Sequence, residues 1–370
     1  MQTAIDLCSD ERTLAELYSA LAFYTAARSG MWQRPPDRAL VHGWAERALA
    51  LAGRQTAARA RGLLARCYWE YETSADRAEE ACAIAERLGD VELLSYAWEA
   101  LATGAFGGKR YEEARELLER CLDVAHAISD PDHLADIYAA AVPPYIALGR
   151  FDDARRLASL HDNVVAPLSP HHHVHGVAVW LDLAELEGNW ERIAELTDRA
   201  RHAVEANLAT PCIWNPRSLL VCALAHAHLG NEDAAARLEA DAEELAGKGF
   251  GMALDAPRIR LALHRGELER ASGLLGVDPG IRSKTWYVLS SIATRIDALA
   301  ALEDRERVEE EAPPLLRPET YLEPFALRAL ALVRADDALA ERAIARFEAL
   351  GLSWHAAATR KPSAGDLTAT

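Results

Sequence analysis

The sequence is poor in the residues that break helices and in paired cysteines. Its 370 residues include 16 prolines and 21 glycines, most of them where a regular period places turns. Long helices rather than short strands should therefore dominate. The six cysteines are widely separated and form no Cys-x-x-Cys pair. We therefore expect buried free thiols, which the cytosol keeps reduced, rather than disulfides.

Basic residues are scarce relative to acidic ones. The 40 lysines and arginines are outnumbered by 57 aspartates and glutamates, which gives a formal net charge of -17. Binding along a nucleic-acid duplex requires a basic stripe that neutralises phosphates. This composition therefore excludes that class of partner, and we expect no nucleic-acid binding.

Long apolar runs are also missing. The sequence has no charge-free apolar stretch of about 18 to 20 residues, the length needed to cross a bilayer. The opening residues, Met1 to Asp6, lack the basic and apolar regions of a signal peptide. We expect no membrane association and a cytoplasmic location.

A turn-and-small-residue pattern recurs along the chain at a spacing of about 36 to 42 residues. Most copies have a turn residue, an aromatic or apolar residue soon after it, and a small residue three or four positions later. Two antiparallel helices need such residues at their tight connection and close crossing. The period therefore indicates a helical-repeat array. The clearest copies are Lys109–Arg115, Gly149–Arg155 and Gly188–Ala194, and weaker copies are Gly230–Ala235 and Gly266–Ala271.

These features predict an all-α fold, a right-handed α-solenoid of about eight antiparallel helical hairpins. Apolar residues recur at intervals of three and four within the expected helices, as on packed bundle faces. We expect one tetratricopeptide-like repeat domain over residues 1–358 and a disordered C-terminal tail over 359–370. Pro143 and Pro144 should kink or break the helix that contains them, and Ser169 with Pro170 should begin another.

Longer strings carry a resemblance to a known family. They resemble the tetratricopeptide-like C-terminal region of large bacterial regulators, typically actinobacterial, in which an adenylate/guanylate cyclase domain and an AAA-type ATPase domain precede the repeats. The likeness spans roughly residues 10–358. It rests on Gly30–Trp32, Ser129–His133, Pro170–Val179, Glu205–Cys212, Asn215–Leu220 and Arg346–Leu352.

The resemblance implies a sensor or partner-docking arm rather than a catalytic domain. It assigns no catalytic residue to the repeats. The two domains that precede the repeats in the family are not among these 370 residues, so the sequence is either a standalone relative or a fragment of a larger regulator. The sequence is consistent with that interpretation. The glycine-rich string Gly104–Arg110 superficially resembles a phosphate loop. However, the position of the first glycine in such a loop is occupied by Thr103, and Arg110 stands where a serine or threonine must contact magnesium.

A histidine cluster is the sharpest chemical candidate. On a helix that starts at Pro170, His171 and His175 lie one turn apart on the same face, and His172 with His175 is the alternative pair. This spacing can hold zinc if a neighbouring helix supplies another ligand. The other interpretations are a polar binding surface and an ordinary polar first turn with neutral imidazoles. No partner pair is visible in the sequence, so we expect no metal and no cofactor.

Other candidates would line the concave surface of the solenoid. Arg217 and Arg258 lie near the starts of first helices, which line that surface in solenoids, and suit a carboxylate or a small anion. Trp214, Trp286 and Tyr287 could add aromatic anchors. Internally paired arginines and core aromatics are the competing interpretations for all five.

Three functions from different classes remain open. The first is a non-catalytic interaction module that binds a protein partner or peptide on its concave face, where the acidic charge favours a basic segment. The second is a small-molecule sensor with a pocket between adjacent hairpins. The third and weakest is a metal-dependent enzyme that uses the His171 to His175 cluster.

Overall fold

The computed structural model describes residues 2–28, 36–69, 75–210, 212–247, 251–275 and 288–360. Within these ranges the regular structure is entirely helical, so the all-α prediction is confirmed. The first half contains α1 (Gln2–Leu7), α2 (Glu11–Ala27), α3 (Arg38–Leu51), α4 (Ala57–Trp69), α5 (Ala75–Leu88), α6 (Val91–Gly107), α7 (Tyr111–Asp123), α8 (Pro131–Ala147) and α9 (Phe151–Val165).

The second half continues in the same way. It contains α10 (Pro170–Glu187), α11 (Trp190–Ala206), α12 (Trp214–His228), α13 (Glu232–Ala246), α14 (Gly251–His264), α15 (Leu268–Leu274), α16 (Val288–Ala301), α17 (Arg305–Glu311), α18 (Glu323–Arg334), α19 (Asp337–Ala349) and α20 (Ser353–Arg360). Short 3₁₀ turns lie at Ala125–Ala127 and Pro313–Leu315.

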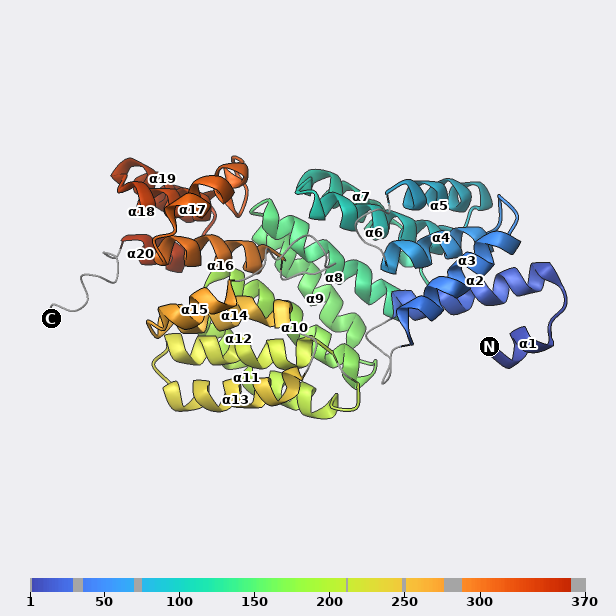
Figure 1. The fold of residues 1–370 in the computed structure, drawn as a ribbon, viewed down its shortest axis with the longest axis horizontal. Helices are drawn as coiled ribbons and strands as arrows, with labels where there is room; N and C mark the ends of the chain where they lie inside the picture. The colour runs from blue at the N-terminus through green and yellow to red at the C-terminus, as the bar shows by residue number, and fades with distance from the viewer. Residues whose placement is uncertain are drawn as a thin grey trace.

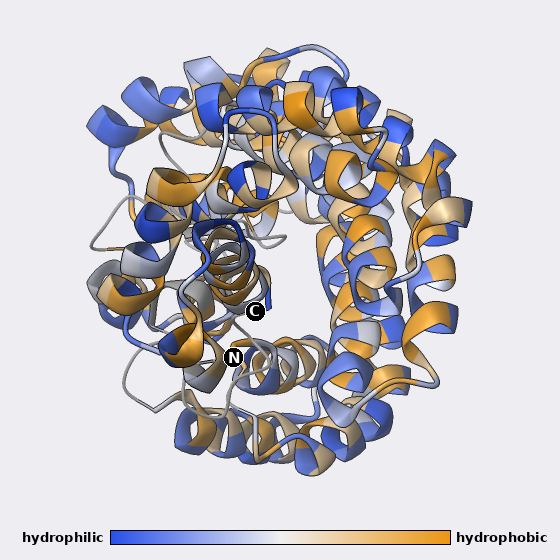
Figure 2. Cartoon of the chain, turned by 90° about the vertical axis from the view of Figure 1, so that its right-hand side faces the viewer, coloured by the Kyte–Doolittle hydropathy of each residue, from blue (hydrophilic) through white to orange (hydrophobic). Residues whose placement is uncertain are grey.

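The helices from α2 to α19 pack as consecutive pairs, and the pairs stack into an elongated solenoid (Figure 1). Viewed along the long axis, the helices encircle a common centre (Figure 2). The solenoid prediction is therefore confirmed. Among the described residues no helix is both long and apolar enough to span a membrane. The proposed domain limits, 1–358, stay a prediction. From residue 361 onward, the proposed tail lies outside the described residues.

The recurring sequence pattern corresponds to the turns between paired helices. The aromatic residues Tyr111, Phe151 and Trp190 each begin a second helix and are buried. The small residues Ala114 and Ala154, three positions later, are fully buried where helices cross. The pattern therefore places each turn and each close helix contact where the repeat requires them.

Helix α8 does not break at its prolines, although a break was one of the two outcomes that the sequence predicted, the other being a kink. It continues through Pro143 and Pro144 to Ala147, and both prolines are buried. Both ends of the helix are capped. The Asp130 carboxylate caps its start, and the N–H of Arg150, which lies beyond its end, donates to the Tyr145 carbonyl in its last turn. Packing therefore overrides the helix-breaking tendency of the two prolines.

The solenoid turns back on itself, so that helices far apart in sequence touch. Tyr321 N–H donates to the Ala147 carbonyl over 2.9 Å, and Tyr321 Oη donates to the Leu186 carbonyl over 3.0 Å. His355 Nε2 lies 3.2 Å from that same Leu186 carbonyl. Tyr321, just before α18, and His355 of α20 therefore both bond the Leu186 carbonyl at the end of α10. A core of buried side chains continues across this contact from Tyr111 to Ala356.

In the turn after α10, the contact with the last helices leaves little space beside the backbone. Gly188 has φ +70°, and a Cβ built there would lie 3.0 to 3.2 Å from three atoms of Trp354. Gly230 occupies the equivalent turn after α12 with φ +76°, and a Cβ there would meet nothing within 4 Å. The two glycines therefore share a left-handed backbone but differ in their surroundings.

We expect Gly188→Ala to lower the free energy of unfolding by about 2 to 4 kcal/mol, because it adds overpacking against Trp354 to left-handed strain. Gly230→Ala should cost only about 1 to 2 kcal/mol, from backbone strain alone. Urea unfolding followed by circular dichroism compares the two. Equal losses would show that Trp354 tolerates the added methyl group.

Candidate functional site

The first helices of the central hairpins meet at a buried charged network. Arg217 of α12 is the largest fully buried side chain. Its Nη2 donates to Glu185 Oε2 over 2.8 Å, and its Nε donates to Asp182 Oδ1 over 3.3 Å. Glu185 is itself 0% exposed. The sequence suggested that Arg217 lines a concave groove. Instead, Arg217 is buried and hydrogen-bonded to α10 inside the protein.

The same network reaches α14 and α16. Arg260 Nη1 donates to Glu185 Oε1 over 3.3 Å, and Ser290 Oγ donates to that oxygen over 2.9 Å. Arg260 Nε donates to Thr294 Oγ1 over 2.6 Å. Glu185 thus joins three neighbouring first helices to α10. The inner face of the solenoid is filled here by the chain's own side chains.

Burial and neighbouring charges act in opposite directions on Asp182. Desolvation raises its pKa to about 7, with a further upward contribution from Glu185, while Arg217 acts in the lowering direction. Asp182 Oδ2 and Ser218 Oγ are buried without a hydrogen-bond partner among the described residues. This network is costly to desolvate, so its stability depends on the pairing of each charge.

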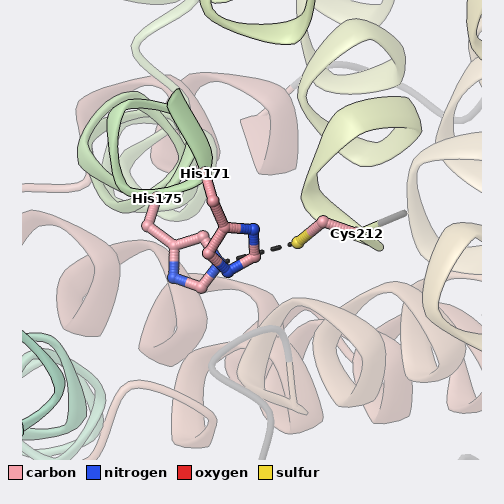
Figure 3. Close-up of side chains that lie close together, drawn as sticks. All are labelled: His171, His175 and Cys212. Atoms are coloured by element: carbon pink, nitrogen blue, oxygen red, sulfur yellow. Dashed lines mark hydrogen bonds between the residues drawn. The ribbon is translucent and has the colours of Figure 1, made fainter. Parts of the chain in front are cut away.

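The histidine cluster forms at the first turn of α10 (Figure 3). Ser169 is the N-cap and Pro170 is in the first turn, as predicted. His171 and His175 lie on the same face of α10 with ring centroids 4.5 Å apart. Cys212, just before α12, brings its Sγ to 3.5 Å from His175 Nε2. No local sequence pattern marks Cys212 as a third member of this cluster.

His172 has a different environment from its neighbours. Its Nε2 is hydrogen-bonded to the Asp132 carboxylate at the start of α8, and its Nδ1 lies 2.8 Å from Ser169 Oγ. Arg28 Nε of α2 lies 2.8 Å from the other oxygen of Asp132. Hydrogen bonding to His172 and the charge of Arg28 outweigh burial and lower the pKa of Asp132. His172 therefore links α10 to α8 rather than joining the His171 and His175 pair.

The protonation states limit the chemistry of this cluster. Burial lowers the pKa of His171 to about 4, and burial lowers that of His175 well below its ordinary value. Burial raises the pKa of the Cys212 thiol to about 11. At neutral pH the imidazoles are neutral and the thiol keeps its proton. A buried, protonated thiol is a poor nucleophile, so this contact is not an activated cysteine–histidine pair.

The other sequence candidates are scattered. Trp214 is 6% exposed and packs in the core beside His175, with ring centroids 6.3 Å apart. Arg258 Nη2 lies 2.5 Å from Glu243 Oε2 of α13, away from Arg217's network. Trp286 and Tyr287 lie outside the described residues. Among the described candidates, Trp214 and Arg217 are buried in the core and Arg258 pairs with α13, so these three do not share one surface.

An open depression lies between the outer helix α13 and the turn that joins α14 to α15. Its volume is about 570 Å³. Ala236 and Ala240 lie among its acidic residues, and their small side chains leave room along one face of α13. Glu239 accepts hydrogen bonds from Arg265 and Arg270, and Arg265 also donates to Glu232 over 3.2 Å, while Asp233 and Glu232 are more exposed at one end. Its lining residues are Glu232, Asp233, Ala236, Glu239, Ala240, Glu243, Arg265 and Glu267.

Comparison with known proteins shows likeness only at the level of structure. No protein-family model matches the chain, and no curated protein matches it. Solved structures similar to it include a Rap protein complexed with competence and sporulation factor, at 13% identity and a TM-score of 0.46, covering 94% of each chain. Another is a signal transduction ATPase with numerous domains and a tetratricopeptide repeat sensor from Pyrococcus horikoshii. It is 15% identical with a TM-score of 0.39, and the match covers 95% of this chain and 64% of that one.

The all-α repeat architecture is established by the fold itself. The closer resemblance to cyclase and ATPase regulators stays a prediction, because no family match bears on it.

Proposed function

We propose that this chain is a non-catalytic helical-repeat module that docks a basic segment of a protein partner. The observation that carries the proposal is the open depression on α13, where four glutamates and one aspartate line a surface with a single arginine. The net charge of -17 attracts a basic partner from a distance and speeds its association. The depression supplies the shape that such a segment would enter.

We place the binding surface on the outer face of the solenoid, on α13, rather than on the concave face that the sequence suggested. The inner helices α10 and α12 are buried almost all round, and Arg217, Glu185 and Ser290 fill the space between them and α16. A partner would have to separate these charges to enter there. In contrast, Glu232, Asp233 and Glu243 are exposed, and a basic segment would compete there only with the surface ion pairs of Arg265 with Glu232 and Arg258 with Glu243.

Charge reversal and filling of the depression test the proposal separately. We expect Glu232→Lys with Asp233→Lys to weaken binding of a fluorescent lysine- and arginine-rich peptide at least tenfold at low salt. Ala240→Leu leaves the charge unchanged but fills the space, and it should weaken the same peptide severalfold. Fluorescence anisotropy measures both effects.

The matched control reverses the same number of charges on another outer helix. Glu112→Lys with Glu116→Lys changes exposed residues of α7 and should alter affinity less than twofold. Equal losses in both charge variants would mean that the peptide responds only to net charge. If no basic peptide binds while a metabolite raises the melting temperature, the sensor hypothesis replaces this one.

We further propose that the module serves a bacterial signalling regulator in the cytoplasm. The support is the resemblance of the strings around Ser129–His133 and Pro170–Val179 to the repeat arms of cyclase and ATPase regulators. Affinity capture from the source cell tests this, with bound proteins and small molecules analysed in the same sample. Recovery of a cyclase or ATPase, lost in the α13 charge variant but retained in the α7 control, is the expected result.

A further inference from the structure

Three metal-ligating side chains converge between the first turn of α10 and the segment that leads into α12 (Figure 3). One ligand-type atom from each of His171, His175 and Cys212 lies within 4.8 Å of the other two. His171 and Cys212 are 6% and 7% exposed, and His175 is partly buried. The three residues come from two helical hairpins, so their meeting is a product of the tertiary fold.

The spacing of these atoms suits a tetrahedral zinc ion. Zinc bonds of about 2.0 to 2.1 Å to nitrogen and about 2.3 Å to sulfur place the two ligand atoms roughly 3.5 Å apart at a tetrahedral angle. The observed separation of His175 Nε2 and Cys212 Sγ is 3.5 Å. Small rotations of the side chains would bring the nitrogen of His171 to its own bonding position. Imidazole and thiolate together are a ligand set that zinc favours over magnesium or calcium.

A second observation points to a ligand at this place. His171 Nδ1 is buried and has no hydrogen-bond partner among the described residues. Buried polar atoms are nearly always satisfied, and those without a partner require an explanation. The neighbouring His172 is engaged with Asp132 and Ser169, which fixes it away from the cluster.

We propose that His171, His175 and Cys212 bind one Zn²⁺ ion, with a solvent molecule in the fourth tetrahedral position. The Cys212 thiol gives its proton to solvent as the sulfur–zinc bond forms. The ion joins the start of α10 to the connection between α11 and α12. This site is separate from the α13 depression and goes beyond the proposed docking function. It also revises the expectation of no metal, which rested on the lack of a visible third ligand.

Metal titration of the full-length protein tests the site directly. Protein stripped with a chelator is titrated with Zn²⁺ in competition with a chromophoric chelator, and bound metal is counted by mass spectrometry. We expect one zinc per chain and a rise of several degrees in melting temperature. Co²⁺ used as a probe should give a thiolate-to-metal charge-transfer band, which reports the sulfur bond independently of stability.

Single variants separate ligands from bystanders. His171→Gln, His175→Gln and Cys212→Ser should each weaken zinc binding at least tenfold, and Cys212→Ser should abolish the cobalt–thiolate band. His173→Gln, on the same helix turn, and Cys8→Ala should change neither. Circular dichroism verifies that each variant is folded. Zinc binding with equal affinity in the ligand and control variants would overturn the proposal, as would the absence of stoichiometric zinc in the folded wild-type protein.

Discussion

Replacing Arg217 with methionine is expected to lower the free energy of unfolding by about 3 to 5 kcal/mol, because it leaves buried carboxylates without their main countercharge. Arg217 is 0% exposed and bonds both Glu185 and Asp182. Methionine fills much of the same space, so the loss reports the charge rather than a cavity. Urea unfolding provides the measurement.

Two further variants make this prediction specific. Arg258→Met removes an arginine that pairs with the exposed Glu243, and it should cost less than about 1 kcal/mol. Combining Arg217→Met with Glu185→Gln should recover part of the loss, since one of the two buried carboxylates that lost the Arg217 countercharge is then neutral. If the double variant is as unstable as the sum of the two single variants, the residues are not coupled and the network is not a unit.

Acid is expected to destabilise the protein well above the pH at which its carboxylates titrate. Burial lowers the pKa of His228 to about 3 and that of His161 to about 4, and it lowers the pKa of His355 well below its ordinary value. Unfolding restores values near 6.5, so the unfolded chain binds more protons below that pH. Stability is therefore full above pH 6.5 and falls as the pH drops toward 4.

Asp182 opposes this trend. Its raised pKa of about 7 means that the folded state holds the extra proton between the ordinary pKa of 3.8 and about 7, so its contribution to stability falls as the pH rises. These three histidines, together with His171 and His175 whose pKa values are also lowered, outweigh this one carboxylate. The net loss from pH 6.5 to 5 should be at least about 3 kcal/mol, measured by denaturant unfolding at each pH.

His228→Phe identifies one contributor to the acid response. The His228 ring stacks on Trp190 with centroids 4.3 Å apart, and phenylalanine preserves that stacking without a titrating group. Positive charge from His264 and Arg260 adds to the effect of burial on the pKa of His228. The variant should lose about 1 to 2 kcal/mol less than the wild type over the same pH range. The exposed His126→Phe is the control, and an identical slope in both variants would contradict the assignment.

The sequence predicted the repeat architecture well because its causes are local. A turn glycine, a following aromatic residue such as Trp190 and a small residue such as Ala154 each act within a few positions, and periodicity reveals them. The same-face pairing of His171 and His175 is local as well, since it needs only the helical repeat. These features could be read without knowing how hairpins stack.

The positions of Cys212 and Arg217 could not be predicted, because they depend on the packing angles between successive hairpins, which accumulate along the array. Cys212 reaches His175 only because α12 begins beside the first turn of α10. Arg217 is buried, rather than presented to a groove, because the solenoid winds tightly enough for Ser290 to contact Glu185. The prolines of α8 failed as a break signal for the same reason: tertiary packing decided the outcome.

The return of the last helices onto the middle of the chain changes how the protein must behave as a whole. An open repeat array responds to mutation near the altered repeat, because each unit touches only its neighbours. Here the Leu186 carbonyl is bonded by Tyr321 and His355. A mutation near the end of the chain can therefore affect the stability of its middle. Lengthening any hairpin between them would shift that meeting point. This contact therefore constrains the number of hairpins in the segment, because adding or removing one would separate Leu186 from Tyr321 and His355.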